Sequence, residues 1–278
     1  MRILDQLDSP LVRRALLEAA LVGALCGVIG VHVLLRRLPF FTLALSHATF
    51  PGVVIASMLG ASVYLGGAVA AVALVLAVAV VGSARRIDAS TATGVALAGA
   101  FALGVVLQSS RRGGSKDLAA FLVGDVLTVS SADIAATLLV GAIAIAAVAI
   151  AHKELVFAAF DSAGAEAVGY RALPLDLLVL GAIAATVVTS VRAVGTILVV
   201  ALLVAPSLTA RVWVDRVGLM MALGAGFGAV AGVVGVAAST QWDVAGGAAI
   251  TLVATAVLLL SLAVQPALQV VNRAPARR

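Results

Sequence analysis

The sequence predicts an all-α fold, a polytopic transmembrane bundle of about nine spans. Hydrophobic residues make up 63% of the 278-residue chain and charged residues only 11%, and the mean hydropathy is +1.20. Soluble domains carry about 25% charged residues. The charges also fall between long uncharged stretches, as expected where each crossing of the hydrocarbon core needs roughly 20 apolar residues.

The uncharged stretches define the predicted spans in chain order. The first, 19–35, ends at Arg36 and Arg37. The second, 38–84, would measure on the order of 70 Å as one helix at about 1.5 Å per residue, so it must hold two crossings. The candidate breaks are Pro51 with Gly52, and the segment 60–67. Six further stretches are each taken as one crossing: 89–110, 134–152, 177–191, 193–210, 217–242 and 244–272.

Two long polar connections interrupt these spans. Residues 111–133 surround a short apolar run, 118–124, that is too short to cross, so an interfacial or re-entrant segment is expected there. The other polar connection lies between His152 and Asp176. No Ser/Gly-rich or Pro-rich linker divides the chain, which predicts a single transmembrane domain over residues 1–278.

The distribution of basic residues predicts an inner-membrane protein with a cytoplasmic C-terminus. If Arg36 and Arg37 face the cytoplasm, nine alternating spans place most Lys and Arg residues inside. The net charge of +5 comes from scattered helix-end pairs, which suit anionic lipid headgroups and not a nucleic acid. Asp5, Asp8 and Glu18 interrupt the first twenty residues, so no cleavable signal peptide is expected.

The chain contains no Gly-Lys dipeptide, which excludes the phosphate-binding G-x-x-x-x-G-K-[ST] loop. The protein is therefore not its own ATPase. Cys-x-x-Cys, His-Glu-x-x-His and Gly-x-Ser-x-Gly motifs are also missing from the sequence, and Cys26 stands alone. We predict no catalytic residue and no permanently bound cofactor, and we expect Cys26 to be a small packing residue.

His47 is the polar residue that stands out, because it lies inside the uncharged stretch 38–84. Pro51 has no backbone N–H, so in a helix the carbonyl of His47 loses its usual partner. Imidazole is a good ligand for zinc, manganese and iron, and broken helices often form transport sites. The alternative is a neutral histidine bonded between helices, with Pro51 as a simple kink.

A resemblance to the zinc/manganese ABC permease family is carried by motifs in the family's order over nearly the whole chain. None of them is specific alone. They are the segment 34–40 followed by Ala44-Leu45-Ser46-His47-Ala48 and Pro51-Gly52, then 117–118 and 121–127, Phe160-Asp161 with Ala165 and 167–169, Val194-Gly195-Thr196-Ile197-Leu198 with 201–206, and Asp243-Val244-Ala245-Gly246-Gly247-Ala248.

The resemblance implies a homodimer with a fold like that of the vitamin B12 importer, a type II ABC importer. It also implies two cytoplasmic ATPase subunits and an extracytoplasmic metal-binding protein as partners. Residues 155–173 would then be a cytoplasmic coupling segment that docks on the ATPase through Phe160, Asp161, Ala165 and Gly169. Asp161 or Ser162 would cap the helix and Gly169 would end it. The alternative is an ordinary interfacial helix.

The sequence departs from the family at Leu43, where an aspartate is usual four residues before the histidine. Positions four apart share a helix face, so one expected ligand is missing. We therefore take the candidate metal ligands to be His47, Ser46, Asp243 and Gln241. The candidate helix breaks are Pro51, Gly52 and Pro206.

These observations predict the permease subunit of an importer that takes up a divalent transition metal, manganese, zinc or iron, as its transported substrate. The alternatives are an ion-coupled secondary transporter, an ABC permease for a metal chelate, and a membrane-embedded scaffold or enzyme. Glycines spaced four apart at Gly23 and Gly27, and again at 224, 228 and 232, predict close helix contacts. The spacing leaves open whether these contacts lie within one chain or across a dimer.

Overall fold

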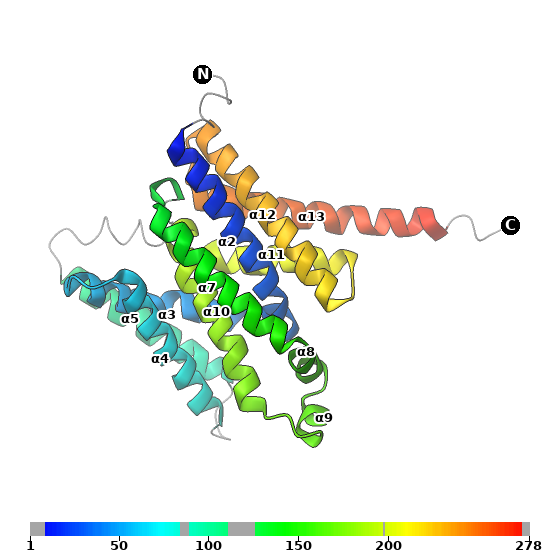
Figure 1. The fold of residues 1–278 in the computed structure, drawn as a ribbon, viewed down its shortest axis with the longest axis horizontal. Helices are drawn as coiled ribbons and strands as arrows, with labels where there is room; N and C mark the ends of the chain where they lie inside the picture. The colour runs from blue at the N-terminus through cyan, green and yellow to red at the C-terminus, as the bar shows by residue number, and fades with distance from the viewer. Residues whose placement is uncertain (1–8, 84–88, 111–125, 197, 274–278) are drawn as a thin grey trace.

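In the computed structural model the protein is a bundle of α-helices (Figure 1). The structure describes residues 9–83, 89–110, 126–196 and 198–273. The predicted re-entrant run 118–124 lies outside the described residues. The helical elements are α2 (Pro10–Leu35), α3 (Pro39–Met58), α4 (Val63–Ser83), α5 (Ala89–Ser109), the short 3-10 helix η1 (Val126–Thr128), α7 (Ser131–Ile150), α8 (His152–Phe160), α9 (Ser162–Ala167), α10 (Ala172–Val194), α11 (Leu198–Trp213), α12 (Val217–Trp242) and α13 (Gly246–Arg273).

Six of these helices are long and apolar enough to cross a membrane: α2, α3, α7, α10, α12 and α13. Helices α4, α5 and α11 contribute shorter apolar stretches. The all-α transmembrane prediction is therefore confirmed, with six long candidate spans among the described residues.

Helix α2 begins nine residues before the predicted start of the first span. Pro10 occupies the first helical position, and the hydroxyl of Ser9 accepts a 3.2 Å hydrogen bond from the Val12 N–H. Both features favour a helix start. The prediction began the first span after Glu18 because a charged residue was taken to end the uncharged stretch. The helix accommodates Glu18, whose carboxyl accepts a 2.7 Å hydrogen bond from Thr137.

The predicted helix breaks at Pro51, Gly52 and Pro206 are wrong. Pro51 and Gly52 lie inside α3, and Pro206 lies inside α11. The stretch 38–84 divides at 59–62, which overlaps the other predicted break at 60–67, and Gly60 there has φ +66°. Gly52 allows close packing: a Cβ atom added there would collide with the carbonyl oxygen of Gly66 on α4.

Helix α2 is central, packing against α12, α11, α10 and α7, and Figure 1 shows α2 running beside α12. A Cβ atom on Gly23 would collide with the backbone of Gly228, and one on Gly232 would collide with that of Ala19. The glycine stripes therefore form a contact between two helices of the same chain, which answers the question that their spacing left open. Helices α3, α4 and α5 form a second group.

Candidate functional site

His47 lies on α3, one turn before Pro51. Its side chain is half-buried, and its ring meets Phe101 of α5 edge-on with 5.2 Å between the ring centroids. No hydrogen bond joins the imidazole to another described residue. The alternative of a neutral histidine hydrogen-bonded between helices therefore has no support among the described residues, and the ring remains available as a ligand.

The hydroxyl groups around His47 are turned toward their own helix. Thr42 donates to the Leu38 carbonyl, Ser46 to the Thr42 carbonyl, both at 3.0 Å, and Thr49 to the Ser46 carbonyl at 2.8 Å. All three side chains are buried. Such back-bonding satisfies hydroxyl groups in an apolar bundle, and it leaves Ser46 with only oxygen lone pairs to offer a cation.

Asp243 and Gln241, the other predicted ligands, are exposed at the end of α12. Asp243 forms the helix C-cap in the left-handed conformation, with φ 52°, a conformation that Asp tolerates better than most residues. Helix α12 packs mainly on α2, α13 and α11. No group of three His, Cys, Asp or Glu residues that could hold a metal lies within the described parts of the chain. The structure therefore assembles no complete ligand set around His47.

The predicted coupling segment, 155–173, covers most of α8 and all of α9. Asp161 caps α9 by accepting a 2.8 Å hydrogen bond from the Gly164 N–H. After the helix, the N–H of Tyr170 bonds to the Ala165 carbonyl and that of Gly169 to the Glu166 carbonyl, both at 3.0 Å. With φ +99° at Gly169, this is a Schellman motif. The predicted start and end of this helix are confirmed.

Apolar side chains on α8 and just after α9 face outward. Phe160 is 69% exposed and Val168 is 72% exposed. Ala165 is only 3% exposed, so its methyl group packs inward and cannot contribute to a docking face as predicted. The segment therefore presents apolar groups from Phe160 and Val168, and the N-cap Asp161 and the terminating Gly169 are exposed beside them.

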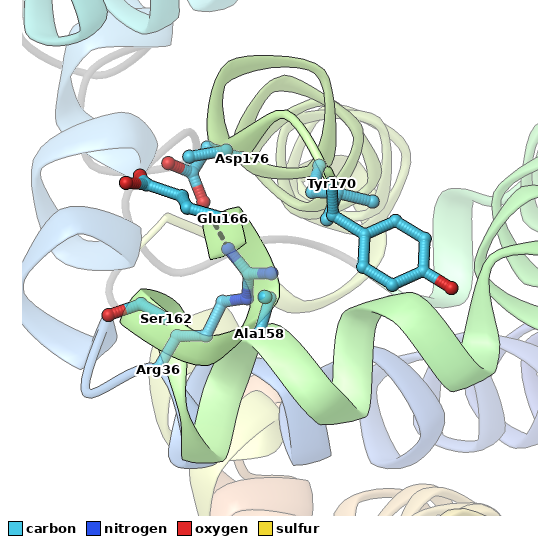
Figure 2. A pocket seen from close by; sticks show the side chains of 9 residues that line it. Arg36, Ala158, Ser162, Glu166, Tyr170 and Asp176 are labelled. Carbon is cyan, nitrogen blue, oxygen red and sulfur yellow. Dashed lines mark hydrogen bonds and ion pairs between the residues drawn. The ribbon is translucent and has the colours of Figure 1, made fainter. Parts of the chain in front are cut away.

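A small pocket of about 70 Å³ lies behind this segment, between α8, α9 and the start of α10. Figure 2 shows Arg36 reaching into it from the turn after α2, with Glu166 and Tyr170 on either side. The guanidinium of Arg36 forms an ion pair with Asp176 on α10. Sequence reasoning missed this pair because the two residues lie 140 positions apart and no local pattern connects them.

A second polar network, also missed, links α2, α7 and α4. Besides the Glu18–Thr137 hydrogen bond, Asp133 accepts hydrogen bonds from the Ser130 N–H and hydroxyl at 2.9 and 2.8 Å, and from the Tyr64 hydroxyl. Ser130 and Asp133 form a capping box at the start of α7. That local pattern could have been predicted from the sequence, but its partners on other helices could not.

Comparison with known proteins decides the family. The profile of the ABC 3 transport family matches residues 8–265. The chain belongs to the ABC 3 transport family. It is 37% identical over 270 residues to the manganese transport system membrane protein MntC of Halalkalibacterium halodurans, covering 97% of this chain and 92% of that protein. This confirms the resemblance that the motifs indicated.

Solved structures agree with this assignment. A structure of PsaBC from Streptococcus pneumoniae in complex with a Fab superposes with a TM-score of 0.85 at 31% identity, covering 93% of this chain and 94% of that one. An inward-facing metal-chelate type ABC transporter gives 0.75 at 17% identity, over 90% and 85% of the two chains, a likeness of fold alone. This ABC 3 family member is thus a multi-pass inner-membrane permease of an ABC transport system.

Proposed function

We propose that this permease moves manganese into the cell as the membrane-spanning subunit of an ATP-driven importer. The observation that carries the proposal is His47: an imidazole without a hydrogen bond to any other described residue, inside an apolar helix, in a family member similar to permeases named for manganese. Polar groups at membrane depth are costly and usually serve a function, and imidazole suits divalent transition metals.

In this proposal His47 lines the path of the ion and does not form a tight resting site. Leu43 stands one turn before His47 on α3, and its alkyl chain offers no ligand. A single neutral imidazole with carbonyl and hydroxyl oxygens holds a divalent ion weakly, which suits conduction because the ion must also leave. Asp243 and Gln241, at the end of α12, would serve only where the ion approaches the permease, separate from His47.

Alternating access across nine spans would complete the transport cycle. The six long helices together with α4, α5 and α11 supply nine apolar helices, and a type II fold of the vitamin B12 importer kind is proposed for them. The permease would work as a homodimer with two ATPase subunits, which hydrolyse the ATP, and with an extracytoplasmic protein that delivers the ion. Residues 1–278 would form one domain.

The coupling segment, 155–173, would dock on the ATPase. Support comes from the exposed aromatic ring of Phe160 beside the capped helix α9. The Phe160 side chain is 69% exposed. Burying such an apolar side chain against a partner is favourable in free energy, because apolar surface leaves water. Docking would move α8 and α9 when the ATPase subunits close.

Manganese accumulation in a bacterial strain that lacks its own manganese importer tests the role of His47. The strain would express the chain with its ATPase and binding protein. Wild type should restore manganese accumulation, and His47→Ala should lower it without reducing the amount of assembled complex in the membrane. If His47→Ala accumulates as much manganese as wild type, the proposal that the ion passes His47 is refuted. Accumulation of zinc in place of manganese would refute the proposed metal.

A further inference from the structure

We propose that Arg36 is a positioning residue that carries movement of the coupling segment to α3, through its ion pair with Asp176. The inference rests on the proposed function and adds to it the link between the ATPase side and the helix that bears His47. It begins from the place of Arg36 in the fold, at the C-cap of α2 and three residues before α3 begins at Pro39.

The turn that holds Arg36 is tightly bonded, so a displacement of Arg36 would pass to α3. The Leu38 N–H bonds to the Val33 carbonyl at 2.9 Å and the Arg37 N–H to the Leu34 carbonyl at 3.2 Å. With Arg37 in the left-handed conformation, φ 57°, this is a Schellman closure. His47 lies eight residues into α3, or about 12 Å along the axis at 1.5 Å per residue.

The other side of the Arg36 pocket is the coupling segment itself. Ala158 of α8, with Ser162, Ala165 and Glu166 of α9, lines the same pocket of about 70 Å³. Ala165 is buried there, so α9 cannot shift inward without changing the space around the guanidinium. Figure 2 shows the Arg36 side chain lying between these helices and Asp176.

The hydrogen bonding of Arg36 is incomplete, which favours a movable contact over a fixed one. The guanidinium reaches Asp176, while its Nε and Nη2 atoms are buried with no partner among the described residues. Arg presents several donors in a fixed fork, and Glu166 lines the same pocket. A shift of α9 can therefore bring a second acceptor to the free donors without breaking the first contact.

The pair is not well suited to a purely stabilising role. The side chain of Asp176 is 53% exposed and that of Arg36 is 12% exposed, and ion pairs in contact with solvent contribute little to stability. The pair joins the end of α2 to the first turns of α10, 140 residues apart in the sequence. Its position between the coupling segment and α3 is the better explanation for its presence.

The test uses the complete complex of permease, ATPase and binding protein in liposomes. Manganese uptake and ATP hydrolysis are measured for wild type, Arg36→Ala, Asp176→Asn, and the exchanged pair Arg36→Asp with Asp176→Arg. Arg37→Asn is the control, since it removes the neighbouring charge and asparagine tolerates the left-handed conformation. Asp176→Asn keeps the shape of a half-exposed side chain, so it should fold even if Arg36→Ala does not.

We expect Arg36→Ala and Asp176→Asn to keep ATPase binding and basal hydrolysis but to lower the manganese moved per ATP by about fivefold or more. The exchanged pair should recover part of this loss, and Arg37→Asn should match wild type. Wild-type uptake per ATP in both single variants would overturn the inference and leave the proposed function standing. Wild type that moves no manganese would overturn the proposed function instead.

Discussion

A Cβ atom added at Gly224 would lie 2.6 Å from the carbonyl oxygen of Gly27, so α2 and α12 touch backbone to backbone. Close approach of this kind is how helices associate in a membrane, where water no longer drives apolar surfaces together. The contact recurs one turn away at Gly23 and Gly228. The two central helices are therefore held together by backbone contacts that are possible only because glycines have no side chains.

Gly224→Leu should destabilise the protein by about 1–3 kcal/mol or more, because the added side chain must push two backbones apart. Gly226→Leu is the matched control, since Gly226 lies on the same helix, is exposed and has no atom within 4 Å of an added Cβ. Thermal unfolding in detergent measures the difference. Equal melting temperatures for the two variants would contradict the α2–α12 contact.

Thr137→Val should destabilise the protein by about 1–3 kcal/mol, because it leaves a buried carboxyl group without its donor. Glu18 is 1% exposed, and Thr137 supplies its 2.7 Å hydrogen bond. Thr137→Ser keeps the hydroxyl and should cost less. The unfolding temperatures of the two variants in detergent check this. A Thr137→Val protein as stable as Thr137→Ser would show that Glu18 does not depend on this bond.

Asp161→Ala should cost α9 about 0.5–2 kcal/mol of helix stability, the usual effect of losing an N-cap acceptor. In the proposed mechanism it also lowers ATP hydrolysis stimulated by the loaded binding protein. Asp161→Asn keeps an oxygen that can accept from the Gly164 N–H, so it should retain most of the activity. Equal stimulated hydrolysis in wild type and Asp161→Ala would argue against a coupling role for α9.

Leu43→Asp should create a stronger resting site for manganese, because it restores a carboxylate one turn before His47 on α3. Leu43 is half-buried, so the new charge costs stability unless the ion neutralises it. We expect tighter manganese binding by the purified permease in calorimetry, and expect the gain to disappear in Leu43→Asp with His47→Ala. Unchanged binding in Leu43→Asp would mean that the two positions do not share an ion.

The sequence predicted the helices themselves better than the places where they begin and end. Long apolar stretches and helix caps are local signals, so the membrane bundle and the ends of α9 at Asp161 and Gly169 could be read directly. The continuation of α3 through Pro51 could not be read from the sequence, because a proline kinks or ends a helix depending on what packs beside it, and here Gly52 lets α4 approach closely. The start of α2 was missed because Glu18 finds a partner only in the folded chain.

The candidate site shows the same division. His47 could be singled out as a polar residue among apolar ones, and its ring has no hydrogen bond to another described residue, which agrees with the proposed ligand role. Asp243 could not be assigned, because a carboxylate near a helix end serves either as a ligand or as a C-cap, and the structure places it as a C-cap with φ 52°. Pairs such as Arg36 with Asp176 join distant segments and leave no pattern in the sequence.

Manganese uptake into liposomes that contain the purified permease, its ATPase and its binding protein tests the central claim most directly. We predict uptake that requires both ATP and the manganese-loaded binding protein, and that stops when the ATPase cannot hydrolyse ATP. Uptake by the permease alone, driven by an ion gradient and indifferent to ATP, would contradict the account and would identify a secondary transporter.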